Sequence, residues 1–151
     1  SAMLDAHPYE EVAYDIYRLE NSSKGYGFGR VGDIKTEFTL KSFSEYVGKK
    51  LQCRAVKYFG DPEKQINRVA VCSGAGSRFY MDALQENADV LVTGDVKHHD
   101  AVDANCMGIS IIDAGHFETE RPGTKIMAEK LAEKLQPFDV TVEYIESVYG
   151  C

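Results

Sequence analysis

The chain has 151 residues, of which 44% are hydrophobic and 27% charged, so it is long enough for one domain with a substantial core. Its 17 basic and 24 acidic residues give a net charge of −7, which argues against strong binding to nucleic acid or to anionic membranes. No apolar run approaches the roughly 18–20 residues that span a bilayer.

The four cysteines are spread along the chain without CxxC spacing: Cys53, Cys72, Cys106 and Cys151. This spacing excludes a zinc ribbon and a thioredoxin motif. Because Cys72 and Cys53 lie in apolar stretches, we expect buried, reduced side chains and a cytoplasmic protein.

The first part of the chain is predicted to be a strand followed by a Gly-rich linker. Residues 12–19 alternate apolar and polar side chains, as in a strand with one buried face. Residues 27–32, GFGRVG, match the GxGxxG fingerprint of dinucleotide sites letter for letter. That fingerprint requires a strand before it and a helix after it, and neither is indicated here, so we predict a flexible connection between two modules.

From residue 31 onward, strands and helices alternate. We predict strands over residues 31–40, 54–59, 66–72, 89–93, 109–113 and 139–146. We predict helices over residues 42–51, 78–86 and 97–107, and a last helix with Pro122 in its first turn that ends near Leu135. This order predicts an α/β fold with a mixed sheet flanked by helices.

Two details of these helices are specific enough to check. Ser42 is predicted to be the N-cap of the first helix, in a capping box with Glu45. The last helix is predicted to face inward with four apolar side chains: Ile126, Met127, Leu131 and Leu135.

Two buried strands are each followed by a glycine and a group of potential ligands. The group after residues 89–93 contains Gly94, Asp95, Lys97, His98 and His99. The group at the end of residues 109–113 contains Asp113, Gly115, His116, Glu118 and Glu120. In open α/β sheets ligands bind at the carboxyl ends of the strands, so these groups form the predicted site.

His116 and Glu120 are the strongest candidate metal ligands. Pro122 argues against a helix through the whole segment, so we expect His116 in a loop and Glu120 at the helix start. An imidazole and a carboxylate that converge there suit a divalent metal such as Zn, Mn or Fe. The alternative is that both side chains cap backbone groups at the helix N-terminus. Further ligands would come from Asp95, His98, His99 or elsewhere.

Asp95, Lys97 and His98 lie at a predicted helix start and are candidates for proton transfer, although each is equally consistent with a solvated or capping group. The Gly-rich turn over residues 73–77 joins a strand to a helix, as in anion-binding turns. Its glycines are equally explained by the backbone geometry of a tight turn, and its role stays open.

Several motifs resemble one family. Residues 90–120, VLVTGDVKHHDAVDANCMGISIIDAGHFETE, closely resemble the second half of the NIF-three-like family, whose members are often named GTP cyclohydrolase I type 2 homologues. Residues 68–79 match that family's Gly-rich turn. HPYEEVAYDIYRLEN and the following GYGFGRVGDI resemble the end of a PII-like or CutA-like insert, so the resemblance covers residues 4–150.

The resemblance implies two similar α/β halves with two divalent metals in the cleft between them, and a hexameric assembly. The GHxxTE motif then assigns His116 and Glu120 as metal ligands, and His98 belongs to a GDxxHH motif of the same half. The first half's ligands are missing here, so we expect a piece of a longer protein that binds metal weakly or not at all alone. Residues 1–30 would be the end of the insert, and residues 31–151 the second half.

The resemblance implies a metal-dependent hydrolase that acts on a nucleotide such as GTP, with a metal-activated water. A non-enzymatic metal-binding scaffold or regulator is the alternative.

Overall fold

A computed structural model of the chain describes residues 6–8 and 27–146. Its centre is a five-stranded mixed sheet in the order β1-β3-β4-β5-β2. Strands β3, β4 and β5 are parallel, while β1 and β2 pair antiparallel to β3 and β5 at the two edges. The strands are β1 (Arg30–Thr39), β2 (Lys57–Phe59), β3 (Gln65–Val71), β4 (Val90–Thr93) and β5 (Ser110–Asp113). The predicted α/β fold with a mixed sheet is confirmed.

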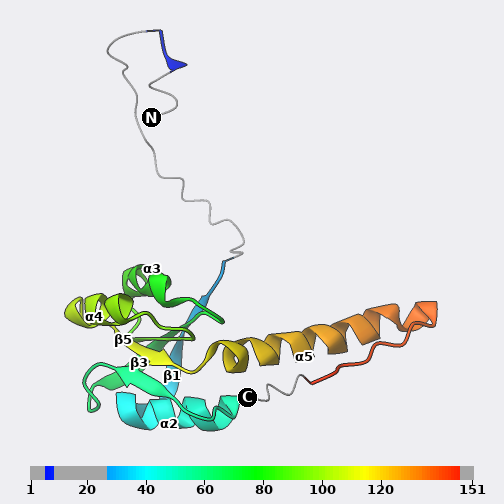
Figure 1. Cartoon of the computed structure of the whole chain (residues 1–151), viewed down its shortest axis with the longest axis horizontal. Helices are drawn as coiled ribbons and strands as arrows, with labels where there is room; N and C mark the ends of the chain where they lie inside the picture. Colours follow the sequence, from blue (N-terminus) through cyan, green and yellow to red (C-terminus); the bar gives the residue numbers. More distant parts are fainter. Residues whose placement is uncertain (1–5, 9–26, 147–151) are drawn as a thin grey trace.

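Helices cover both faces of this sheet. Helix α2 lies on one face, and α3 and α4 lie on the other, while α5 projects away from the sheet (Figure 1). The helices are α2 (Leu40–Leu51), α3 (Tyr80–Gln85), α4 (His98–Cys106) and α5 (His116–Leu135). Single 3-10 turns, η1 (Ser77–Phe79) and η2 (Gln136–Phe138), precede α3 and follow α5. No helix in residues 6–8 and 27–146 is long and apolar enough to cross a membrane.

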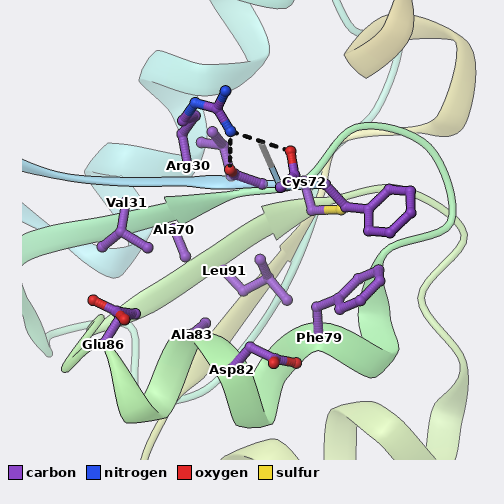
Figure 2. A pocket seen from close by; sticks show the side chains of 13 residues that line it. Arg30, Val31, Ala70, Cys72, Phe79, Asp82, Ala83, Glu86 and Leu91 are labelled. Atoms are coloured by element: carbon purple, nitrogen blue, oxygen red, sulfur yellow. Dashed lines mark hydrogen bonds between the residues drawn. The ribbon is translucent and has the colours of Figure 1, made fainter. Parts of the chain in front are cut away.

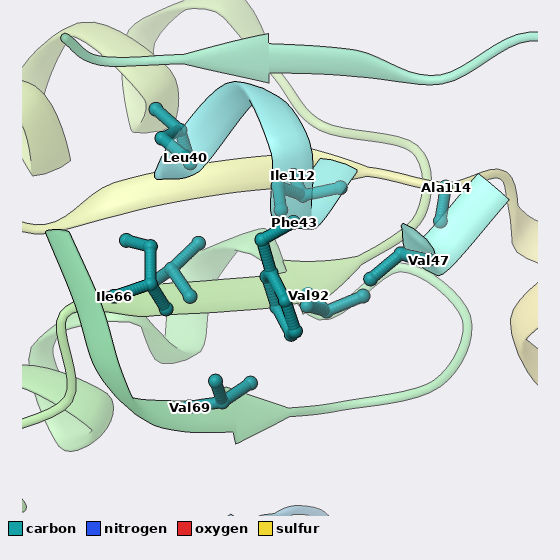
Figure 3. Close-up of a cluster of buried hydrophobic side chains, with 9 residues drawn as sticks. Leu40, Phe43, Val47, Ile66, Val69, Val92, Ile112 and Ala114 are labelled. Atoms are coloured by element: carbon teal, nitrogen blue, oxygen red, sulfur yellow. The ribbon is translucent and has the colours of Figure 1, made fainter. Parts of the chain in front are cut away.

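The core has two layers because successive strand residues point to opposite faces. Val90, Val92 and Ile112 pack with the apolar side chains of α2 (Figure 3). Leu91 and Ile111 pack on the other face against α3 and α4. All four residues of β4 are buried, as expected for the central strand of a sheet with both faces covered.

The capping box of α2 differs from the predicted one by three residues. Thr39 is the N-cap, and Ser42 is the third helical residue. The Ser42 amide donates to Thr39 Oγ1, and the Thr39 amide donates to Ser42 Oγ. The helix begins early because Leu40, at its first position, is fully buried in the core. Ser42 therefore takes the role that we had assigned to Glu45.

The predicted inward face of α5 is wrong. Ile126, Met127 and Leu131 are 51%, 57% and 43% exposed, and no described residue of α5 is buried. Their helical spacing is that of a packed stripe, but α5 leaves the sheet, so the described residues cover these side chains only in part.

The predicted strand over residues 139–146 is also wrong, because these residues form no regular element. They follow α5 away from the sheet and run back beside it, where the described part of the chain offers no strand to pair with (Figure 1). The predicted strand over residues 12–19 lies outside the described residues. Strand β2 is shorter than predicted, and the helix predicted from residue 78 begins as η1.

Candidate functional site

Three loops meet at the carboxyl ends of β3, β4 and β5. Parallel strands end at the same edge of a sheet, so the turns that follow them are neighbours. The Gly94 amide donates to the Gly74 carbonyl at 2.9 Å, which joins the first loop to the second. A Cβ atom on Gly94 would lie 2.6 Å from the Gly115 carbonyl group and from the His116 amide. The second and third loops therefore touch through backbone atoms, which requires glycine at position 94.

His116 is the centre of a polar cluster at this edge. Its Nδ1 lies 2.6 Å from Asp95 Oδ2, and its Nε2 lies 3.4 Å from Glu120 Oε1. All three side chains are about half exposed, so solvent reaches them. Asp95 adopts a left-handed backbone conformation, with φ of 49°, in the turn after β4. Aspartate is among the few residues that tolerate this conformation.

The two carboxylates favour the protonated form of the imidazole. The hydrogen bond to Asp95 raises the pKa of His116, and the negative charges of Glu120 and Asp95 add to this shift. In the protonated form both ring nitrogens donate to carboxylates. In the neutral form the ring keeps one N–H for a carboxylate and offers the other nitrogen as a lone pair.

The predicted loop before Pro122 is wrong, because α5 starts at His116 and continues through this proline. The ring leaves the Glu118 carbonyl without its usual helical donor, a cost that the helix tolerates here. As a result, His116 and Glu120 lie one helical turn apart on the same face. This is the geometry that their spacing would have predicted without the proline.

The structure brings Asp95 to His116 but not the histidine pair of α4. His98 and His99 are exposed, and their rings contact each other edge to face with centroids 5.8 Å apart. Within the described residues, no hydrogen bond or ion pair joins either ring to His116 or Glu120.

The turn over residues 73–77 is held by hydrogen bonds to the elements around it. The Gly74 amide donates to Thr119 Oγ1, and the Gly76 amide donates to Thr93 Oγ1, both at 2.9 Å. Ser77 Oγ donates to the Asp100 carboxylate, which ties η1 to α4. Gly74 has a positive φ of 67°, and a Cβ atom there would lie 2.6 Å from Glu120 Oε1. These contacts favour a structural role for the two glycines and a close fit against Glu120.

Thr119 and Asp113 hold the loops together, a role that sequence reasoning missed: it named Asp113 only as a potential ligand and gave Thr119 no role. Thr119 Oγ1 accepts from Gly74 and can donate to the Gly115 or His116 carbonyl. The Asp113 carboxylate accepts from the Val96 and Gly115 amides, so it caps two loops at once. Thr119 stands inside GHxxTE, and its hydroxyl beside a glutamate is the one feature that could have indicated this role.

Arg121 fixes the start of α5 against α2. Its guanidinium donates to the Leu51 carbonyl at 2.6 Å and to Gln52 Oε1 at 3.2 Å. The cation thus lies at the negative end of the α2 dipole, where it is favourable.

Within residues 6–8 and 27–146, no group of three or more His, Cys, Asp or Glu side chains is arranged to hold a metal ion.

The fold and this cluster define an α/β protein with a His-carboxylate site at the carboxyl ends of parallel strands. Residues 2–149 match the sequence model of the Duf34/NIF3 (NGG1p interacting factor 3) family, and the chain belongs to that family. The expected resemblance is confirmed.

Curated relatives and a solved structure agree with this family. A protein of Bacillus subtilis named GTP cyclohydrolase 1 type 2 homolog is 43% identical over 135 residues, which are 89% of this chain and 35% of the relative. A Staphylococcus epidermidis protein of the same name is 40% identical over 85% of this chain and 36% of its own length. A crystal structure of a Bacillus cereus protein related to NIF3 superposes with a TM-score of 0.76 at 34% identity, over 99% of this chain and 42% of that one. The chain thus spans about a third of the length of these curated relatives.

Proposed function

We propose that this chain supplies one side of a divalent-metal site and that the full-length protein is a metal-dependent hydrolase acting on a nucleotide. The observation that carries the proposal is the 3.4 Å separation of His116 Nε2 and Glu120 Oε1. Two donors bound to one tetrahedral metal at about 2.0–2.2 Å lie about 3.3–3.6 Å apart. The donor set suits Zn, Mn or Fe.

Asp95 has a positioning role in this proposal. A metal-bound histidine usually donates its other ring N–H to a carboxylate, which fixes its tautomer and orientation. The hydrogen bond from His116 Nδ1 to Asp95 matches this arrangement and leaves Nε2 facing Glu120. Because the chain alone offers two ligands, the others would come from the rest of the full-length protein, and two metals would be shared between its halves.

A divalent metal held by His116 and Glu120 would supply an activated water and would polarise the bond under attack. Asp95 would keep His116 in the tautomer that binds, and His98, at the exposed start of α4, would carry protons to and from the solvent. GTP is the nucleotide suggested by the name of the relatives in Bacillus subtilis and Staphylococcus epidermidis.

The test is elemental analysis of the full-length protein, purified without chelator, together with its His116→Ala and Glu120→Gln variants. We expect about two metals per wild-type chain and a loss of at least one in each variant. His99→Ala, which removes an exposed imidazole of α4, is the matched control and should keep the wild-type content. Unchanged metal in His116→Ala would refute the ligand assignment.

An assay for turnover of GTP and of simple phosphoesters distinguishes a metal-dependent hydrolase from a non-enzymatic metal-binding scaffold or regulator. If the metal-saturated full-length protein releases no product from GTP or from simple phosphoesters, the hydrolase proposal fails. A metal-binding scaffold or regulator would then be the better description, because metal retention does not require turnover.

We also propose that the protein is a homo-oligomer, with a hexamer expected for the full-length form. The exposed side chains of Ile126, Met127 and Leu131 support this, since monomers rarely expose such a stripe. Sedimentation of this chain should show association that Met127→Glu weakens. A monomer at all concentrations would contradict self-association of this chain.

We further propose a cytoplasmic location and a boundary near residue 30. The free cysteines Cys53, Cys72 and Cys106 support a reducing cytoplasm. The start of β1 at Arg30 is consistent with a boundary between residues 1–30, the end of an insert, and residues 31–151, the second half.

A further inference from the structure

A cavity of about 340 Å³ lies between β1, β3 and α3, and none of Asp95, His116 and Glu120 lines it. This volume is in the range of small-molecule sites. Its floor is apolar and is formed by Val31, Ala70, Ala83 and Leu91. Figure 2 shows Arg30 on the β1 side and Asp82 and Glu86 on the α3 side. The cavity is therefore an apolar pocket with charged side chains at its sides, separate from the proposed metal site.

An exposed aromatic ring stands at the cavity. Phe28 is 84% exposed, yet it stacks on Phe79 with ring centroids 5.7 Å apart and planes inclined by 21°. Gly29 allows this wall to run close to β3, because a Cβ atom there would lie 2.8 Å from the Val71 carbonyl oxygen. The phenyl surface that Phe28 leaves open is suited to a flat apolar partner.

Of the charged side chains around the cavity, Arg30 is engaged in hydrogen bonds, whereas Asp82 and Glu86 have no ion-pair partner among the described residues. The Arg30 guanidinium donates to the carbonyls of Gly27 and Gly29 at 3.1 and 2.7 Å, so it holds the wall in place. Asp82 lies in the first turn of α3, Glu86 is the C-cap of that helix, and both line the cavity. Neither carboxylate has an ion-pair partner in the described part of the chain.

We propose that this cavity binds a small organic cation with a flat aromatic body. The body would lie on the apolar floor and stack on Phe28, and its ammonium group would face Asp82 and Glu86. An anionic ligand of the same shape would meet those two carboxylates and be repelled. The cavity shares no residue with the proposed metal site, so ligand binding here does not depend on metal binding there.

Tryptamine is a direct probe, because the chain contains no tryptophan and indole fluorescence can be followed without background from that residue. Indole-3-propionate is its matched control, with the same ring and linker but a carboxylate in place of the amine. We expect saturable binding of tryptamine and at least tenfold weaker binding of the acid. Absence of saturable tryptamine binding, or equal binding of the acid, would overturn the proposal.

Variants then assign the binding to this cavity. Phe28→Ala should weaken tryptamine about threefold to tenfold through loss of stacking. Asp82→Asn with Glu86→Gln should weaken it about twofold to fivefold for each exposed charge pair lost. Phe138→Ala removes another exposed phenyl ring, 73% exposed on η2, and should leave binding unchanged. Full tryptamine affinity in Phe28→Ala would exclude this cavity as the site. A loss of affinity could not be ascribed to misfolding, because Phe28 is exposed and its truncation leaves the core intact.

Discussion

His116 Nδ1 and Asp95 Oδ2 lie 2.6 Å apart, a hydrogen bond that joins the first residue of α5 to the turn after β4. The two residues belong to different strand-loop-helix units, so this bond couples two parts of the fold. It also holds the imidazole in one orientation toward Glu120.

We expect Asp95→Asn to lower the pKa of His116 toward its ordinary value of 6.5, because the largest cause of the upward shift is the hydrogen bond to this carboxylate. The pKa can be read from the imidazole proton resonances in an NMR titration. Asp103→Asn, an exposed carboxylate on α4, is the matched control and should leave the titration unchanged. A pKa of His116 that does not move in Asp95→Asn would show that the bond is not formed in solution.

The same shift predicts how stability depends on pH. The folded chain holds the His116 proton more tightly than the unfolded chain, since its pKa is raised above 6.5. The stabilisation is therefore complete below about pH 6.5 and is lost as the pH rises through the raised pKa. The effect is small because the side chain is half exposed. Urea unfolding of His116→Gln, followed across this pH range, should show a weaker decline than the wild type, and an equal decline would contradict the raised pKa of His116.

Ile111→Ala should destabilise the chain by about 2–5 kcal/mol, because Ile111 is fully buried between β4 and β2 and the truncation leaves a cavity. Ile126→Ala is the same substitution on the exposed face of α5 and should change the free energy of unfolding by less than about 0.5 kcal/mol. Urea unfolding at low protein concentration measures both. Equal effects would mean that α5 packs on a surface that the described residues do not provide.

Gly94→Ala should destabilise the chain and separate the two loops that it joins. Its Cβ would lie 2.6 Å from Gly115 backbone atoms, which cannot yield as a flexible side chain would. Gly123→Ala has open space around the new atom and lies within α5, so it should stabilise by about 0.4–1 kcal/mol. Thermal unfolding would test both, and a stabilising Gly94→Ala would contradict the close contact.

The sequence predicted the parts of the fold that depend on local patterns. The apolar run that became β4 predicted a buried strand, and the polar residues after it predicted the edge where the candidate site lies. Pro122 led to the wrong prediction for residues 116–121. A proline usually interrupts a helix because it lacks the amide donor, but α5 begins at His116 and continues through Pro122. Residues 139–146 alternate like a strand, but the alternation does not tell whether a partner strand is near. The roles of Thr119 and Asp113 were out of reach because they depend on loops that meet only in three dimensions.

Helix α5 carries the His116–Glu120 pair in its first turn and the exposed stripe of Ile126, Met127 and Leu131 farther along. Neighbouring positions on a helix differ by about 100° in direction, so the azimuth of the stripe also sets the azimuth of the imidazole. Any surface that covers the stripe therefore limits how far α5 can roll about its axis. In the proposed full-length assembly, contact at this stripe would therefore also set the direction in which His116 and Glu120 point.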